Sequence, residues 1–355
     1  MNRQYVVICF FNASSGGHGS AEVALSLFKS LPGSKIFLEF SKSLEVNNFL
    51  INNLNKIYFL LISLYNLKKF FKRKNKKIII IEGASWIGFS FVFLHLIKIL
   101  NKNIFIIYHA HNVEYEIRAK KNNILISKLS WFFEKNVYEK ADIATSVSEQ
   151  DRSIIKKLYN TESILFPNGV HSSRLIATKP KKKIPVNYYL YSGTYLYNPN
   201  KIAINYLFKF IYPLLNKNYP ELKLILTGRG LPKKYRTLKN VIYFDYLEKK
   251  YLNYIIKNAK FLLLPLQKAP GTKLKIIEAL LLNAKIITTK HGMRGIKTLN
   301  DKNPLVYNNP KELMRLIKKI MSTVKNSSKN NFSSYGYFKK QYLMDILIKN
   351  IIQKI

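Results

Sequence analysis

The sequence predicts an α/β protein built from two Rossmann-like, doubly wound domains. Its 355 residues exceed the usual size of one hydrophobic core, so two domains of roughly 170 residues each are expected. Apolar runs of strand length alternate with helical patterns, and the alternation starts again after a segment rich in proline and lysine. Hydrophobic residues make up 48% of the chain, which is enough to fill both cores.

Five strands are expected in the first half of the chain. The opening run YVVICFF leads through a glycine-rich loop into a helix with Ala24, Leu27, Phe28 and Leu31 at helical spacing. The further strands are KIFLEF, KIIIIEG, NIFIIYHA and ADIATSVS. Continuous runs of isoleucine and valine, instead of alternating ones, are typical of a parallel sheet that is covered on both faces.

The same alternation is predicted for a second domain over residues 188–335. Residues 175–187 lose all periodicity and carry a lysine run, as a linker would. Strands are then expected at NYYLYSGT, LKLILTGRG, NVIYFDY, KFLLLPL and KIITTK, with helices over 201–216 and 248–258. A last helix over 336–355 is expected to pack back toward the first domain.

The formal net charge of +40 raises the question of an acidic partner. Only 9 of the 59 basic residues are arginine, the side chain on which readers of bases and phosphates rely, so the lysine excess is interpreted as compositional. Attraction to the anionic inner face of the plasma membrane is the alternative. Residues 50–77 join an apolar stretch to a basic one, a pattern that fits either a bilayer surface or a domain helix with a solvated basic end.

The compartment predicted from the sequence is the cytoplasm, with peripheral contact to the membrane as a further expectation. The single cysteine, Cys9, excludes an internal disulfide and fits a reducing environment. The opening run is interpreted as a strand and not as a signal peptide, because it lacks small residues resembling a cleavage site. No uninterrupted apolar run reaches the roughly 18 residues that a membrane span needs.

The segment QKAPGTKLKIIEALLL follows a predicted strand and opens a helix. Gly271 would let the backbone approach a ligand, and the N–H groups of Thr272, Lys273 and Leu274 would form an anion site at the helix start. Glu278 lies seven residues beyond Gly271, roughly 10 Å along the axis, which suits a diphosphate at one end and ribose hydroxyls at the other. The alternative is a capped amphipathic helix with a surface glutamate.

The stretch PGTKLKIIEALLLNAKIITTKHGMRGI resembles the donor-site signature of the family 4 glycosyltransferases, Gly-Thr-x-Leu-Lys followed by Glu-Ala, a strand and a glycine-containing loop. The resemblance implies the GT-B fold, in which two Rossmann-like domains face a central cleft. It assigns the acceptor to residues 1–174, the nucleotide sugar to 188–335, and ribose binding to Glu278. In many members this glutamate is the second of a Glu-x7-Glu pair, and Pro270 stands here at the first position.

Two more stretches of the second half carry the resemblance. YSGTYLYNPNKIAINYLF is similar to the family's strand and loop beside the donor phosphates, with Gly193 for close approach and Lys201 as a phosphate cation. The family often has arginine directly after that glycine, where Thr194 stands here, so the charge must come from Lys201 or Lys273. LTGRG resembles the next glycine turn, with Arg229 either at the pyrophosphate or at the surface.

Two loops of the first half complete the resemblance. SSGGHGSAE resembles the family's Gly-Gly turn near acceptor and donor phosphate, which assigns that loop to Gly16 and Gly17. YHAHNVEYE resembles its His-Asn-x-Glu segment, in which a histidine faces the transferring sugar. His111 is therefore the expected catalytic residue, ahead of His109, and its neutral form would hydrogen-bond the sugar without repelling nearby cations.

The resemblance implies a retaining glycosyltransferase that moves a sugar from a nucleoside diphosphate sugar to a glycan or lipid-linked acceptor. A role in surface polysaccharide synthesis, such as capsule or lipopolysaccharide, is expected. No cofactor, metal ion or nucleic acid is expected, since the sequence has no Asp-x-Asp run and basic residues would stabilise the leaving diphosphate. Two alternatives stay open: a basic nucleic-acid-binding protein, and a nucleotide-sugar epimerase of the same fold.

Overall fold

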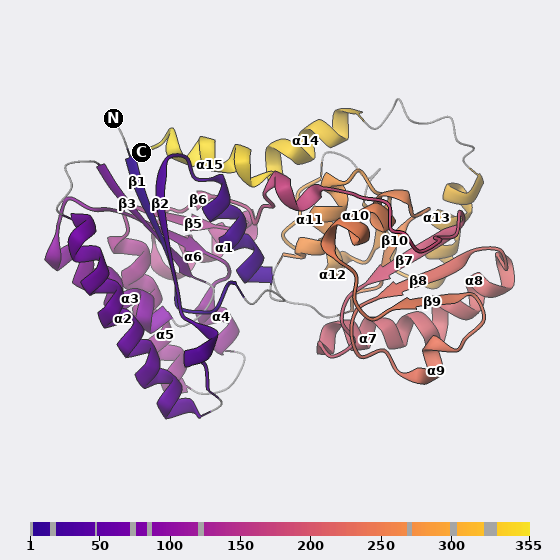
Figure 1. Cartoon of the computed structure of the whole chain (residues 1–355), viewed down its shortest axis with the longest axis horizontal. Helices are drawn as coiled ribbons and strands as arrows, with labels where there is room; N and C mark the ends of the chain where they lie inside the picture. Colours follow the sequence, from indigo (N-terminus) through magenta and orange to yellow (C-terminus); the bar gives the residue numbers. More distant parts are fainter. Residues whose placement is uncertain are drawn as a thin grey trace. The chain divides into compact units, whose positions relative to one another are not determined.

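The structure is a computed structural model that describes residues 3–14, 19–46, 48–71, 76–83, 87–119, 124–267, 272–298, 304–322 and 332–355. The chain divides into two compact units (Figure 1). The first consists of Met1–Gly169 together with Leu347–Ile355, and the second of Val170–Ile346. Each unit has its own hydrophobic core, as two separate Rossmann-like domains require.

The first unit contains a six-stranded parallel sheet with the order β2-β1-β3-β4-β5-β6. The strands are β1 (Arg3–Cys9), β2 (Ser34–Glu39), β3 (Lys76–Gly83), β4 (Phe105–Ala110), β5 (Ile143–Ser146) and β6 (Ile164–Leu165). The helices are α1 (Gly19–Ser30), α2 (Phe49–Phe71), α3 (Ile87–Leu100), α4 (Glu114–Ala119), α5 (Ile124–Lys140) and α6 (Glu149–Tyr159). Most side chains of β1, β3 and β4 are buried, which explains why these strands appear as continuous apolar runs.

The register of this sheet aligns polar residues at the carboxyl ends of neighbouring strands. Cys9 of β1 pairs with Glu82 of β3, and Glu82 pairs with His109 of β4. Side chains at paired positions project from the same face of a sheet. The strand order reverses between β1 and β3, and ligands of open α/β sheets bind at the carboxyl ends of such a switch point.

The second unit contains another six-stranded parallel sheet, with the order β12-β11-β10-β7-β8-β9. The strands are β7 (Tyr188–Ser192), β8 (Lys223–Thr227), β9 (Val241–Phe244), β10 (Leu262–Leu264), β11 (Ile286–Thr288) and β12 (Leu305–Val306). The helices are α7 (Asn198–Tyr206), α8 (Tyr212–Asn218), α9 (Lys233–Arg236), α10 (Lys249–Asn258), α11 (Leu274–Leu281), α12 (Lys290–Met293) and α13 (Pro310–Ser322). Counted within this unit the order is 3-2-1-4-5-6, that of the Rossmann fold.

The helix predicted over 201–216 is not one α-helix. A π-helical segment, Leu207–Ile211, separates α7 from α8. Pro213 lies in the first turn of α8 and has no N–H to donate to the preceding turn, so the regular hydrogen-bond ladder is interrupted there.

Two helices end the chain, α14 (Phe332–Tyr342) and α15 (Met344–Ile352). Val170 exchanges backbone hydrogen bonds with Tyr342 and Met344, which ties the start of the second unit to its end. In the part of the chain that the structure describes, no helix combines the length and apolarity that crossing a membrane requires.

Glu134 of α5 stabilises the first turn of α4 from within the core. Its carboxylate accepts hydrogen bonds from the backbone N–H groups of Glu114 and Tyr115, each 2.8 Å long, and from the hydroxyl of Tyr159 at 2.7 Å. Without the carboxylate these donors would be buried and unsatisfied. We expect Glu134→Ala to lower the free energy of unfolding by about 2–4 kcal/mol, measured by urea denaturation.

The matched control for this variant is Glu139→Ala on the same helix. Glu139 is exposed and lies 3.7 Å from Lys135. A pair of this kind contributes about 0.5 kcal/mol or less. Equal stability of the two variants would contradict the role given to Glu134.

Candidate functional site

The carboxyl ends of β7 and β10 form the switch point of the second sheet. Both strands are central and adjacent, and the strands that follow them in the chain lie on opposite sides of the pair, β8 beside β7 and β11 beside β10. The loop after β7 begins at Gly193, and the segment after β10 leads into α11. Ligands of Rossmann domains bind at this place, so the two segments that the sequence singled out lie at the expected site.

Lys275, in the first turn of α11, is the cation that reaches the end of β7. Its ammonium donates to the carbonyl of Ser192 and to Oδ1 of Asn200, both at 2.9 Å. Burial lowers the pKa of Lys275 to about 8. An ammonium has three N–H donors, so the contacts with described residues use two and leave one for a ligand.

Gly193 lies beside this lysine with a φ of 156°, a backbone conformation that residues with side chains rarely adopt. A Cβ atom on Gly193 would lie 2.8 Å from Nζ of Lys275 and 2.8 Å from Nδ2 of Asn200, which is closer than such atoms approach. The Gly193 loop is also joined to the loop after β8, because the N–H of Tyr195 and the hydroxyl of Thr194 both donate to the carbonyl of Arg229. These hydrogen bonds therefore hold together the two glycine turns that are predicted at the donor.

Two of the predicted donor cations are exposed. Nζ of Lys201 lies 5.9 Å from the centre of the Tyr195 ring, and the guanidinium of Arg229 lies 5.8 Å from that of Tyr246. Arg229 lies in the loop after β8, and Lys201 lies in α7, the helix that follows the Gly193 loop. Their donor-binding roles stay predictions.

The predicted anion site at the start of α11 is described in part. Gly271 lies outside the described residues, whereas Thr272 is half-buried, Lys273 is buried and Leu274 is the first helical residue. Burial, together with the positive charge of Arg294, lowers the pKa of Lys273 to about 8. A buried cation therefore precedes the helix start.

Glu278 is buried and paired with two cations, instead of standing alone at the surface. Its Oε1 accepts from Nη2 of Arg174 at 3.2 Å, and its Oε2 accepts from Nζ of Lys249 at 2.6 Å. A carboxylate has about four acceptor positions, so both cations can stay in place while hydroxyl groups bind. Glu278 lies three residues after Lys275, and residues at this spacing lie on one helical face.

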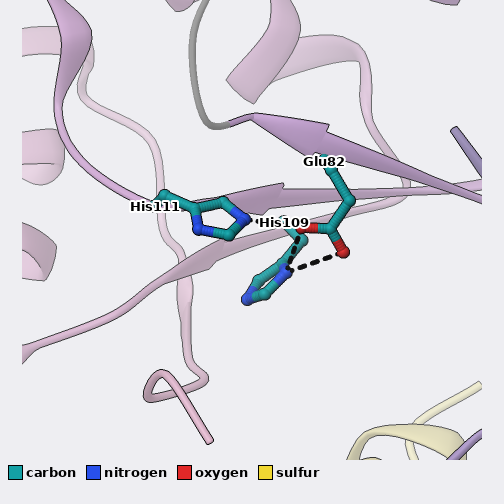
Figure 2. Close-up of side chains that lie close together, drawn as sticks. All are labelled: Glu82, His109 and His111. Carbon is teal, nitrogen blue, oxygen red and sulfur yellow. Dashed lines mark hydrogen bonds and ion pairs between the residues drawn. The ribbon is translucent and has the colours of Figure 1, made fainter. Parts of the chain in front are cut away.

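In the first unit, Glu82, His109 and His111 form a buried cluster at the ends of β3 and β4 (Figure 2). Nδ1 of His109 lies 3.1 and 3.0 Å from the two carboxylate oxygens of Glu82, and Nε2 of His111 lies 2.5 Å from Oε2. A carboxylate only accepts hydrogen bonds, so both ring nitrogens donate. The sequence singled out both histidines, but not the glutamate that orients them.

The charge state of this cluster follows from its contacts. Burial alone would raise the pKa of Glu82, but its interactions with His109 and His111 outweigh that effect and hold the pKa at about 2. Burial lowers the pKa of His111, against the opposing effect of the carboxylate. Neutral His111 with a proton on Nε2 presents Nδ1 as a hydrogen-bond acceptor.

Among the described residues, these three side chains also have the spacing of metal ligands. Their possible ligand atoms all lie within 4.8 Å of one another. Two imidazoles and one carboxylate could hold a transition metal. Their mutual hydrogen bonds occupy the carboxylate, whereas Nε2 of His109 is buried without a hydrogen-bond partner among the described residues. Gly16 and Gly17, the predicted phosphate loop, lie outside the described residues.

Two family models match the chain, one in each half. Residues 23–174 match the model described as Glycosyltransferase Family 4, and residues 187–323 match the one described as Glycosyl transferases group 1. No curated protein sequence is significantly similar to the chain. The two matches together span most of both sheets described above.

Several solved structures are similar to this chain in fold. Sucrose-phosphate synthase from Thermosynechococcus elongatus has a TM-score of 0.70 at 13% identity, and the alignment covers 99% of this chain and 98% of that one. HepE of Anabaena, in complex with UDP and glucose, has a TM-score of 0.68 at 10% identity, with coverage of 99% and 98%. The trehalose-6-phosphate synthase OtsA gives 0.68 at 11%, also with 99% and 98%. The predicted GT-B fold is confirmed.

Proposed function

We propose that this chain, which belongs to the family 4 and group 1 glycosyltransferases, transfers a sugar from a nucleoside diphosphate sugar to a glycan or lipid-linked acceptor with retention of configuration. The observation that carries the donor assignment is Lys275 at the switch point of the second sheet, with Glu278 on the same face of α11. A cation in the first turn and a carboxylate about one turn further along the same face match the diphosphate and the ribose of a nucleotide. Structures with the same fold contain UDP or UDP-glucose, which supports the choice of ligand.

The chemistry of the proposed reaction needs stabilisation of the leaving diphosphate. Breaking the glycosidic bond places negative charge on the diphosphate while the sugar becomes oxocarbenium-like. Lys275 and Lys273 would counter that charge, and the N–H groups at the start of α11 would add the positive end of a helix dipole. The expected independence from metal ions follows from this use of lysine and helix, and unchanged turnover in EDTA would support it.

The first unit is proposed to hold the acceptor and to contribute His111 to the transferred sugar. Neutral imidazole accepts a hydrogen bond from a sugar hydroxyl without adding positive charge beside an oxocarbenium ion. A lipid-linked acceptor for surface polysaccharide synthesis, used at the inner face of the plasma membrane, suits the strong positive charge of the chain.

A calorimetric titration of UDP, GDP and ADP tests the donor site. One diphosphate should bind selectively, and Glu278→Ala should weaken that binding by about tenfold or more, because the ribose hydroxyls lose a charged acceptor. Glu278→Gln keeps the shape of the side chain and checks for misfolding. The control is Glu248→Ala, since Glu248 is exposed and pairs only with Lys250 in the described structure.

The alternatives give different results in the same experiment. A nucleic-acid-binding protein would bind none of the three diphosphates and would bind DNA or RNA with a steep dependence on salt. An epimerase would bind a nucleotide sugar and convert it without any acceptor. Selective diphosphate binding followed by sugar transfer contradicts both.

A further inference from the structure

Helix α2 is apolar on its outer face as well as on its inner one. The inner face packs into the core through Phe59, Leu60, Leu67 and Phe70. The outer face exposes large apolar side chains along nearly its whole length, with Leu50 and Tyr65 each 71% exposed. The exposed residues are Leu50, Ile51, Leu54, Ile57, Tyr58, Leu61, Ile62 and Tyr65. A domain helix normally turns a polar face to water, so this exposed apolar face indicates a site of contact with a partner.

The shape of the outer face indicates a broad, flat partner. At 100° per residue, the exposed apolar side chains from Ile57 to Ile62 span an arc of about 140°. The 23 residues of α2 give it a length of about 34 Å. A two-helix seam uses a narrower stripe, so the arc is wider than pairing with one other helix requires.

The charges on α2 and in the sequence after it indicate a negatively charged partner. The helix contains no Asp or Glu, and exposed Lys68 lies in line with the apolar stripe at its carboxyl-terminal end. In the sequence, Lys72, Arg73 and Lys74 follow directly. A second copy of this chain would bring the same net charge of +40 to the contact and would be repelled, whereas an anionic surface would be attracted.

We propose that the outer face of α2 docks on an anionic lipid bilayer. The helix lies in the plane of the interface, with its leucines and isoleucines among the acyl chains. Tyr58 and Tyr65 reach the headgroup level, and Lys68 extends to the lipid phosphates. This inference goes beyond the donor site and does not depend on it, because docking needs neither nucleotide nor catalysis.

Vesicle binding of the full chain tests the proposal. The protein is sedimented with vesicles of phosphatidylcholine alone and with vesicles that also contain phosphatidylglycerol. We expect strong binding to the mixed vesicles, and Leu54→Gln/Leu61→Gln should weaken it by about tenfold or more. Both leucines are exposed, so the variant should melt like the wild type. The control is Ile176→Gln/Val186→Gln, which removes two exposed apolar side chains of the second unit and should bind like the wild type.

Three results would overturn the proposal. If Leu54→Gln/Leu61→Gln binds mixed vesicles as well as the wild type does, adsorption is electrostatic only and α2 is not the docking face. If the control variant loses as much binding, the effect is not specific to α2. If the wild type binds neither kind of vesicle, and sedimentation velocity shows a dimer that the α2 variant does not form, the outer face of α2 is a contact between two copies of this chain. The nucleotide titration is made without lipid, so its outcome is independent of these.

Discussion

Replacing Lys275 by methionine should weaken binding of the selected nucleoside diphosphate by about 30- to 1000-fold in calorimetry, equivalent to about 2–4 kcal/mol. The ammonium is held against the carbonyl of Ser192 at the switch point of the second sheet, with one donor left for a phosphate oxygen. Because the site is partly withdrawn from water, losing a charge-assisted hydrogen bond costs more there than at the surface. Lys201→Met is the matched control, since Lys201 is exposed and should cost tenfold or less.

The pKa of Lys275 adds a pH dependence to this prediction. Burial lowers that pKa to about 8, so the ammonium is mostly charged at pH 7 and loses its proton as the pH rises through 8. Diphosphate affinity should therefore fall between about pH 7.5 and 9. Lys275→Arg should reduce that fall, because arginine stays protonated, and the part that remains comes from Lys273, whose pKa is also about 8. A larger loss in Lys201→Met than in Lys275→Met would reverse the assignment and return the phosphate role to Lys201.

Lys275 is a candidate donor-site residue that the sequence analysis missed. The sequence assigns the segment after KFLLLPL to the donor from its glycine and its following helix, with Lys201, Arg229 and Lys273 as the expected cations. Lys275 lies three residues before Glu278 and so shares its helical face, a signal that was present in the sequence. What the sequence could not provide was the contact with β7, because that depends on β10 lying beside β7 in the sheet.

Glu82 could not be found from local patterns for the same reason. It ends the run KIIIIEG, where one polar residue after four isoleucines suggests only the end of a buried strand. Its pairing with His109 follows from the adjacency of β3 and β4. His111 was identified through the resemblance, yet the carboxylate that fixes its proton lies 29 positions earlier in the chain.

The fold class was predictable because the burial of parallel strands appears directly as continuous apolar sequence. The strand order was not, since alternation of strands and helices fits both the order of the first sheet and that of the second. α2 was only partly predictable. Its apolar composition was visible, but which side chains face water depends on packing of Phe59 and Leu67 into the core.

Replacing His111 by alanine should lower kcat for sugar transfer by about 10²–10³-fold, while the affinity for the nucleoside diphosphate stays unchanged. His111 is proposed to hydrogen-bond the sugar in the transition state, and the diphosphate contacts lie in the second unit. UDP-glucose serves as the probe donor if the titration selects UDP, and release of UDP is measured. An unchanged kcat would contradict the role of His111.

Glu82→Gln tests whether Glu82 orients the imidazole of His111 or only fills space in the same cluster. The amide fills the same volume but can present an N–H to Nε2 of His111, which would move the imidazole proton to Nδ1 and remove the acceptor offered to the sugar. We expect kcat to fall by about tenfold or more with unchanged diphosphate affinity and unchanged melting temperature. Loss of activity in EDTA that zinc restores would instead make the cluster a metal site, and would overturn both this role and the expected independence from metal.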